Sequence, residues 1–389
     1  MRICDPLLPV FAREFDTTLA AAAATTTGFA VAYGATQLFF GPLGDRIGRL
    51  PVIVAAIAIA AAASVLSAVA GSLDLLIASR ILTGAFAAAA IPLSLAWIAD
   101  TVPFAGRQPV LARYLIGQML GMTGGQIGGG ILADWIGWRA AFWVVAAIFA
   151  GASLMLLRSM RPARDAVRAG APPKSDDPAR GHAPRAAPPA GFLRQTALLF
   201  SDRWAATVLL AASLEGMFLF GAVALIASYL QRVFAVSPSI AGTVTALFGL
   251  GGIVYAVNAR RLLGRLRSAG LARAGGGCFA AAMLLLIALP GWQPAILATL
   301  MAGLGYYMLH NTLQNQATQL STEARGAALA WFASGLWLGQ GIGVSLAAIA
   351  AERFGFHAVF AVSGLGLVVI GLAFGRAVAR REAGVSSSM

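Results

Sequence analysis

The chain has 389 residues, of which 59% are hydrophobic and 11% are charged, and its mean hydropathy is +0.79. An ordinary soluble domain has roughly a quarter of its residues charged, so this composition excludes a water-exposed surface over most of the molecule. The formal net charge of +13 suggests nucleic-acid binding only if the basic residues are spread over such a surface.

Apolar segments long enough to cross a bilayer recur along the whole chain. An α-helix needs about 20 apolar residues to cross roughly 30 Å of hydrocarbon. The apolar segments between polar breaks predict eleven spans, at residues 19–40, 51–70, 73–99, 111–133, 138–158, 204–231, 239–258, 271–290, 294–319, 327–351 and 357–377. We therefore expect an all-α membrane protein that crosses the bilayer many times.

A polar segment at residues 159–203 separates the first five spans from the last six. It is rich in proline, arginine and alanine, a composition typical of a disordered linker. The sequence thus predicts an N-terminal helical bundle at 1–158, this linker, a C-terminal bundle at 204–380 and a tail at 381–389.

Basic residues are concentrated in alternate loops. One set of loops contains the linker and Arg46, Arg49, Arg107, Arg113, Arg260, Arg261, Arg265, Arg267, Arg273, Arg325, Arg376, Arg380 and Arg381. The opposite set contains only Arg13, Arg139, Arg232 and Arg353. The positive-inside rule makes the first set and the C-terminus cytoplasmic, in a cytoplasmic (inner) membrane. Topology then accounts for the net charge, and no nucleic-acid partner is needed.

The two halves of the chain repeat each other. Residues 134–142 resemble residues 352–360, which pairs Gly137 with Gly355 at an offset of 218 (355 minus 137). A weaker similarity pairs Gly48 with Gly264 at an offset of 216 (264 minus 48). Nearly equal offsets indicate duplicated halves that run in the same sense.

The repeat also predicts how the chain begins. Subtracting about 218 from the span at 204–231 places most of its partner before residue 1. We therefore expect residues 1–9 to be only the outer end of a first helix, and the native protein to begin upstream of Met1.

A glycine-rich turn joins the first two predicted spans, with the sequence Gly41-Pro-Leu-Gly-Asp-Arg-Ile-Gly-Arg49. It resembles the most diagnostic signature of the major facilitator superfamily, G-x-L-(small)-D-R-x-G-R-(R/K). The matching residues are Gly41, Leu43, Gly44, Asp45, Arg46, Gly48 and Arg49, whereas Leu50 stands where the family often has a basic residue.

This resemblance implies a fold and a mechanism. The family fold is two six-helix bundles around a substrate site near the membrane midplane, and the bundles rock to give alternating access. The resemblance also implies that the turn latches the cytoplasmic side when the transporter opens outward, with Asp100 as the expected partner of Arg46 or Arg49. The alternative interpretation is a solvated turn without a coupling role.

Arg80 lies inside an apolar span and, with Gly84, resembles the R-x-x-x-G element of the family's fourth helix. A cation there costs on the order of 2.5 to 3.5 kcal/mol on insertion scales, so it normally faces a cavity or an acid. The resemblance implies that Arg80 tunes a protonatable site. The alternative is an arginine whose head group reaches the outer interface.

Glycines recur every four residues in the span from residue 111. Gly117, Gly121, Gly125 and Gly129 share one helical face, where a neighbouring backbone can approach closely, and Gly124 and Gly128 lie beside them. The pattern resembles the G-P-x-x-G-G element of antiporters in the family, although Gly125 stands where proline is expected. Helix packing alone is the alternative explanation.

Glu215 is predicted to lie near the middle of its span. A carboxylate buried there favours its protonated form, which suits a proton carrier. A neutral acid that only hydrogen-bonds a neighbouring helix is the alternative.

Uncharged polar side chains are candidates for a substrate path. Tyr307, Asn311 and Gln314 fall near one helical face, His310 is beside them, and Gln126 and Gln340 lie in the glycine-rich spans. Tyr33 and Gln37 are similarly placed. A lone histidine is more often structural than a ligand, so His310 is a weak candidate.

A secondary transporter of the family is the function that these features favour, most similar to bacterial drug and sugar efflux permeases that exchange protons for a small molecule. We expect a monomer in the lipid bilayer with no metal and no cofactor. His182, His310 and His357 are scattered, which argues against an enzyme. An importer or symporter, or a non-transporting receptor or scaffold of the same fold, remains open, and the sequence does not name the substrate.

Overall fold

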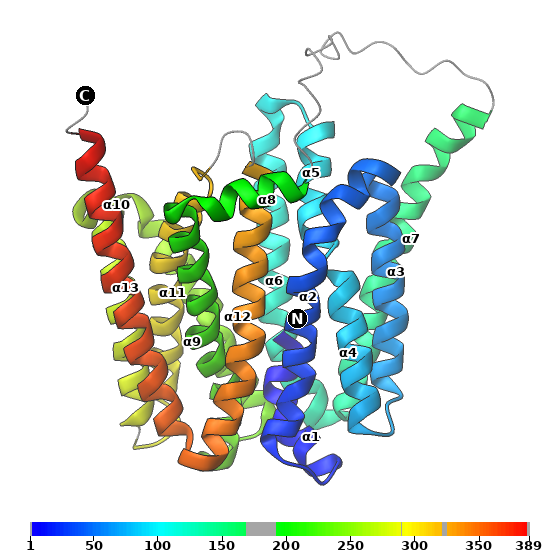
Figure 1. Ribbon diagram of the computed structural model, residues 1–389. Coiled ribbons are helices and arrows are strands. Elements are labelled where there is room, and N and C mark those ends of the chain that lie inside the picture. Colours follow the sequence, from blue (N-terminus) through cyan, green and yellow to red (C-terminus); the bar gives the residue numbers. More distant parts are fainter. Residues whose placement is uncertain (1, 169–191, 289, 321–324, 387–389) are drawn as a thin grey trace.

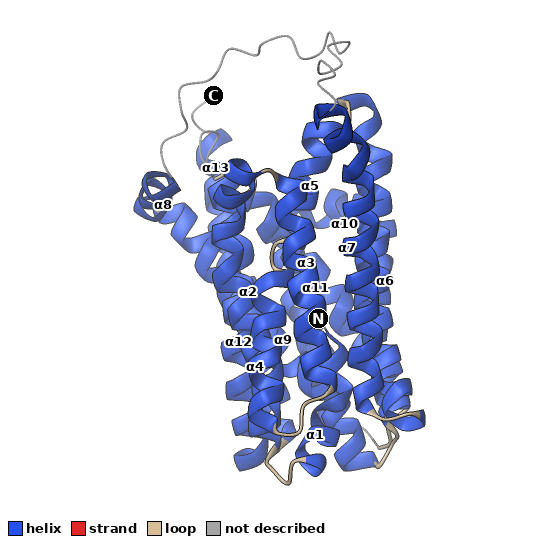
Figure 2. Cartoon of the chain, turned by 90° about the vertical axis from the view of Figure 1, so that its right-hand side faces the viewer, coloured by secondary structure: helices blue, strands red, loops and turns tan. Residues whose placement is uncertain are grey.

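A computed structural model describes residues 2–168, 192–288, 290–320 and 325–386. Helices joined by short turns make up this part of the chain, and it contains no strand. Figures 1 and 2 show the long helices running roughly parallel to one another, while one short helix, α8, lies across their ends. The predicted all-α architecture is confirmed.

The helices form two groups in chain order. The N-terminal bundle consists of the 3-10 helix η1 (Arg2–Leu7) and of α1 (Leu8–Glu14), α2 (Leu19–Ile47), α3 (Arg49–Ala68), α4 (Leu73–Ala87), α5 (Ala90–Thr101), α6 (Phe104–Trp135) and α7 (Trp138–Arg168). After α8 (Phe192–Ser201), the C-terminal bundle consists of α9 (Arg203–Phe234), α10 (Pro238–Ile287), α11 (Ala295–Ala317), α12 (Arg325–Phe354) and α13 (Phe356–Ser386).

Many of the helices are long and apolar enough to cross a membrane. Seven helical segments of the described residues satisfy both requirements. One of them is α10, whose 50 residues rise about 75 Å and so cover two spans of about 30 Å each. The predicted span 239–258 lies in α10, and the span 271–290 begins in it and runs past its end at Ile287; α10 is kinked at Arg267 (φ 55°, ψ 175°).

The stronger part of the predicted repeat has a backbone counterpart. Gly137 lies between α6 and α7 with φ +107°, and Gly355 lies between α12 and α13 with φ +84°. Positive φ favours glycine because a Cβ would be strained there. The weaker pairing has no such backbone counterpart at Gly264: the turn at Gly48 has φ +101°, whereas the break in α10 is at Arg267, three residues after Gly264.

One predicted span contains a break, and one predicted linker needs correction. The predicted span 73–99 matches a single apolar segment, Leu73–Thr101, long enough to cross a membrane. Its helix is interrupted at Ala88 and Ala89, because Pro92 has no N–H to bond the carbonyl of Ala88 and its ring crowds that carbonyl. The predicted linker 159–203 is too long, because α7 continues to Arg168 and α8 occupies 192–201. Residues 169–191 of that segment lie outside the described residues.

The bundles meet along two pairs of helices, α2 with α12 and α6 with α10. The backbones come close where glycine leaves room: a Cβ added at Gly130 of α6 would collide with the carbonyl of Pro238, and one at Gly242 of α10 would lie 2.5 Å from the carbonyl oxygen of Gln126. In the middle of the other pair, the Ser334 hydroxyl donates a hydrogen bond of 2.7 Å to the carbonyl of Gly34.

We call the end of the bundles that holds the turn at Gly48, α8 and the kink at Arg267 the basic end, and the other end, with the turns at Gly137 and Gly355, the opposite end. The chain starts about halfway between them, and η1 and α1 lead to the opposite end (Figures 1 and 2). Every residue of η1 is buried.

Candidate coupling site and substrate path

A carboxylate and an imidazole from different helices meet inside the C-terminal bundle. The Nδ1 atom of His310 on α11 lies 2.8 Å from Oε2 of Glu215 on α9. Glu215 is fully buried, whereas the His310 side chain is 13% exposed. Glu215 lies 12 residues after Arg203, or about 18 Å along α9. The predicted proton carrier and the histidine of the predicted substrate path thus form one pair.

Aromatic rings surround this pair. The ring of His310 stacks on Tyr306 with centroids 4.8 Å apart, and Phe332 lies 5.5 Å away. Tyr306 in turn contacts Phe220 at 5.3 Å. The rings pack around the pair, and His310 is the more accessible of its two side chains.

A second buried ion pair, which the sequence did not predict, lies in η1. Arg2 Nη1 is 2.9 Å from Asp5 Oδ2, and both residues are buried. Gln126, predicted for the substrate path, instead donates a hydrogen bond of 3.4 Å to the same Asp5 oxygen. The sequence feature that could have indicated this pair is the carboxylate of Asp5, which stands beside Pro6 in an apolar segment.

The two buried pairs are connected through aromatic rings. The guanidinium carbon of Arg2 lies 4.4 Å from the centroid of the Phe220 ring, which contacts Tyr306 and through it His310. A cation over a ring face is attracted by the ring quadrupole. The N-terminal segment is therefore packed directly against the C-terminal bundle at the level of the coupling pair.

Arg80 on α4 is 2% exposed, so it does not extend to the interface. Its guanidinium lies 4.5 Å from the centroid of the Phe29 ring and 5.6 Å from that of Phe142. Among the described residues, its Nε and Nη2 have no hydrogen-bond partner. A permanent cation is thus enclosed by aromatic rings in the N-terminal bundle.

The remaining substrate-path candidates fall into two places. Tyr33 is buried and packs 4.3 Å from Trp337 across the α2–α12 interface, one turn from the buried Gln37. Tyr307 and Asn311 are half-buried and Gln314 is exposed, so this face of α11 opens toward the basic end. Gln340 is buried on α12.

The glycine-rich turn forms an ion network within the N-terminal bundle. Arg49 Nη1 lies 2.7 Å from Asp100 Oδ2, and Arg49 Nη2 lies 3.5 Å from Asp45 Oδ1. Arg49, and not Arg46, is therefore the partner of Asp100. A Cβ at Gly44 would lie 2.6 Å from the end of the Leu93 side chain, which would have to shift, whereas a Cβ at Gly41 would have no neighbour within 4 Å among the described residues.

The glycine face of α6 is used unevenly. A Cβ at Gly129 would lie 2.6 Å from the carbonyl oxygen of Ile3, and one at Gly125 would lie 3.8 Å from the Ile3 nitrogen. Gly117, Gly121, Gly124 and Gly128 have no neighbour within 4 Å among the described residues. The predicted close packing therefore exists only toward the opposite end, and the α6 backbone toward the basic end is free.

Two carboxylates connect the bundles at the opposite end, and the sequence analysis did not single them out for this. Asp134 at the end of α6 accepts a hydrogen bond of 2.8 Å from the backbone N–H of Ser239 in α10. Glu352 at the end of α12 accepts one of 2.9 Å from the backbone N–H of Ala20 in α2. The two acids are paired by the repeat (352 minus 134 is 218), so the contacts are related by the duplication.

The Major Facilitator Superfamily model matches residues 2–324. The chain belongs to the major facilitator superfamily. It is thus a multi-pass membrane protein of a family of transporters rather than of enzymes, and the fold predicted from the turn at Gly48 is confirmed.

Similar proteins agree with this assignment. A chloramphenicol resistance protein of Pseudomonas aeruginosa is 34% identical over 140 residues, which is 35% of this chain and 33% of the relative. A triacylglyceride transporter of Mycolicibacterium hassiacum is 38% identical over 120 residues, 30% of this chain and 22% of the relative. These alignments thus span a third or less of the relatives' own length.

A solved structure resembles the whole fold. It is a bacterial homologue of the human lysosomal transporter Spinster in an inward-facing and unoccupied conformation, with a TM-score of 0.72 and 18% identity over 97% of this chain and 91% of the other. At that identity the likeness concerns the fold.

Proposed function

We propose that the chain is a secondary active transporter that exports a small drug-like or sugar-like molecule across the cytoplasmic membrane in exchange for protons. The observation that supports this most is the Glu215–His310 pair, a titratable pair enclosed in a membrane bundle. In this proposal the basic end and the C-terminus are cytoplasmic, as the positive-inside rule predicts.

The pair can couple protons to a conformational change through its net charge. With Glu215 ionised and His310 neutral, the pair is negative, and burying a net charge in a bundle is costly. A proton taken up by His310 makes the pair neutral overall, and the charged hydrogen bond between the two then offsets part of the desolvation. Protonation therefore favours closure around the pair, and deprotonation favours exposure.

The interface between the bundles supports alternating access. Close glycine contacts and two carboxylate contacts join the bundles at the opposite end, while α6 toward the basic end is exposed. This arrangement fits a state that is open to the cytoplasm. Export is further favoured by a relative named for chloramphenicol resistance, and a lipophilic solute is in keeping with a relative named as a triacylglyceride transporter.

Transport in proteoliposomes under an imposed pH gradient tests the proposal. We expect gradient-driven flux of at least one solute in a panel of drugs, sugars and lipids. Glu215→Gln should abolish the dependence on the gradient, because without the carboxylate a proton on His310 would leave a buried, unpaired cation instead of a neutral pair. Asp74→Asn, at an exposed carboxylate on α4, is the matched control and should keep it.

Three other outcomes of this experiment would contradict parts of the proposal. Unchanged coupling in Glu215→Gln would remove the proton-carrier role from this pair. Solute flux in the same direction as protons would indicate an importer or symporter. No gradient-dependent flux of any solute would favour a receptor or scaffold of the same fold.

A further inference from the structure

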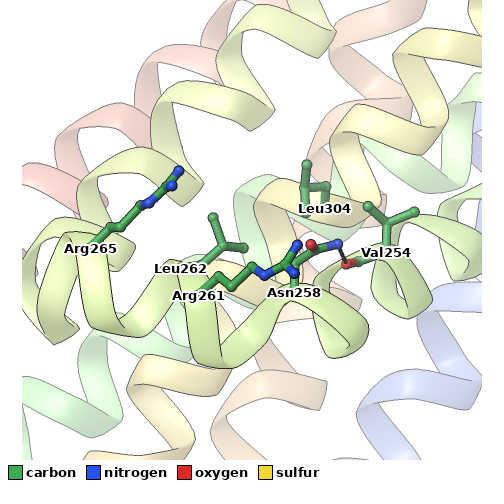
Figure 3. Close-up of a pocket in the computed structure, with 6 residues that line it drawn as sticks. All are labelled: Val254, Asn258, Arg261, Leu262, Arg265 and Leu304. Atoms are coloured by element: carbon green, nitrogen blue, oxygen red, sulfur yellow. Dashed lines mark hydrogen bonds between the residues drawn. The ribbon is translucent and has the colours of Figure 1, made fainter.

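A pocket at the basic end lies outside the coupling site. It has a volume of about 360 Å³ and is lined by Val254, Asn258, Arg261, Leu262 and Arg265 of α10 and by Leu304 of α11. Figure 3 shows these side chains, with Leu304 on the helix that faces the α10 turns. We propose that this pocket binds the phosphate head group of an anionic phospholipid of the cytoplasmic leaflet through Arg261 and Arg265.

The two arginines lack a counter-charge. Among the described residues, neither forms an ion pair with a carboxylate. The sequence between Glu215 and Glu323 contains no Asp or Glu at all, so α10 and α11 have no acid of their own. Both arginines are exposed and lie four residues apart, hence on the same face of the helix.

The corresponding region of the N-terminal bundle contains the carboxylates that are missing around Arg261 and Arg265. In the N-terminal bundle, Arg49 is neutralised by Asp45 and Asp100. The turn at Gly48 corresponds to the kink at Arg267, an offset of 219 (267 minus 48), so Asp45 corresponds to Gly264 and Asp100 to Gln319. The duplicated site has therefore kept basic residues and has no carboxylates, and an external anion supplies the missing charge.

The lining of the pocket suits an amphiphile. Leu304 lies nine residues after Ala295, about 14 Å from the start of α11 and thus at the depth of hydrocarbon. Val254 is 36% exposed, and Asn258 donates a hydrogen bond of 2.9 Å to the Val254 carbonyl. Acyl chains can thus contact Val254 and Leu304, while the phosphate meets the arginines at the loop that the charge distribution predicts to be cytoplasmic. Basic pockets between helices on this side of a membrane are suited to anionic head groups.

Native mass spectrometry of the purified full chain, titrated with phosphatidylglycerol, tests the site. The double variant Arg261→Gln/Arg265→Gln should bind the first lipid about thirtyfold more weakly, about fivefold for each arginine. The matched control is Arg376→Gln/Arg380→Gln, which removes two exposed arginines of the same spacing from α13 and should bind like wild type.

Two further arms separate the lipid from other ligands. Arg261→Lys/Arg265→Lys keeps the charge and the fold, and should retain most of the affinity. Phosphatidylcholine, which has no net charge, should bind weakly. The proposal is overturned if Arg261→Gln/Arg265→Gln binds phosphatidylglycerol as wild type does, or if inorganic phosphate alone displaces the lipid at equal concentration, because the site would then select a free anion.

Discussion

At the opposite end of the molecule, each bundle places a carboxylate on the first turn of a helix in the other bundle, through Asp134 with Ser239 and Glu352 with Ala20. At the basic end, the carboxylates Asp45 and Asp100 stay within the N-terminal bundle and pair with Arg49. Asp134 and Glu352 therefore join the two bundles in this conformation, whereas Asp45 and Asp100 form ion pairs within one bundle.

The difference has a physical basis. The first turn of a helix has unpaired backbone N–H groups and a partial positive charge, so a carboxylate stabilises it without a basic side chain. In the alternating access proposed above, such contacts can break without leaving an unpaired arginine behind. We therefore expect the opposite end to decide how stable the inward-open state is.

The largest effect is expected at Gly130. A leucine there would collide with the Pro238 carbonyl and prevent the opposite end from closing. We predict that Gly130→Leu shifts the protein to the outward-open state and lowers transport more than tenfold, seen as longer distances between spin labels on α6 and α10. Gly151→Leu on α7, where the described residues leave open space, is the control. A wild-type distance distribution in Gly130→Leu would show that the glycine contact does not close this end.

Removing both carboxylate contacts should have the next largest effect. A side-chain acceptor at a helix N-terminus contributes about 1 kcal/mol, and the two contacts share no residue, so Asp134→Ala/Glu352→Ala should destabilise the closed opposite end by about 2 kcal/mol. Spin-label distances should then show roughly thirtyfold more outward-open protein. If either single variant gave the whole shift, the two contacts would not be equivalent, and the comparison based on the repeat would fail.

The hydrogen bond in the middle of the interface should matter less. Ser334→Ala removes one buried bond to the Gly34 carbonyl, which contributes about 1 kcal/mol. We predict a small drop in the thermal unfolding midpoint and equal effects on both conformations, because the bond lies between the two ends. A change in the inward-to-outward ratio as large as that of Asp134→Ala would contradict this.

The smallest effect on stability is expected at the basic end. Asp100 is 56% exposed, and ion pairs in solvent contribute about 0 to 1 kcal/mol. Asp100→Asn should therefore leave the unfolding midpoint within about a degree of wild type in this conformation. Asp45→Asn should do the same, and any loss of transport in either variant would then arise from the outward-open state.

Much of the fold was predictable from the sequence because its causes are local. Span lengths, the glycine-rich turn and the Gly137–Gly355 repeat each depend on a few neighbouring residues. The break between α4 and α5 also has a local cause in Pro92, but a continuous apolar segment hides it. Helix α8 was missed because the composition of residues 159–203 as a whole indicates a linker.

The site was less predictable because its contacts join distant residues. Glu215 and His310 are 95 positions apart, and Asp5 and Gln126 are 121 apart. Which faces of α9, α11 and α6 meet depends on how the helices pack, and the periodicity of one helix does not contain that information. The polar residues were therefore found as candidates, but Gln126 and His310 were assigned to the substrate path and not to their carboxylate partners.

The enclosed arginine of α4, Arg80, places a charge where the membrane potential can act on it. Arg80 cannot lose its proton under physiological conditions, so its charge moves whenever α4 moves along the membrane normal. One elementary charge moved across 100 mV amounts to about 2.3 kcal/mol, and a shift through a tenth of the field to about 0.2 kcal/mol. If the N-terminal bundle rocks as the proposed function requires, its motion is therefore sensitive to the membrane voltage itself, in addition to any gradient of protons.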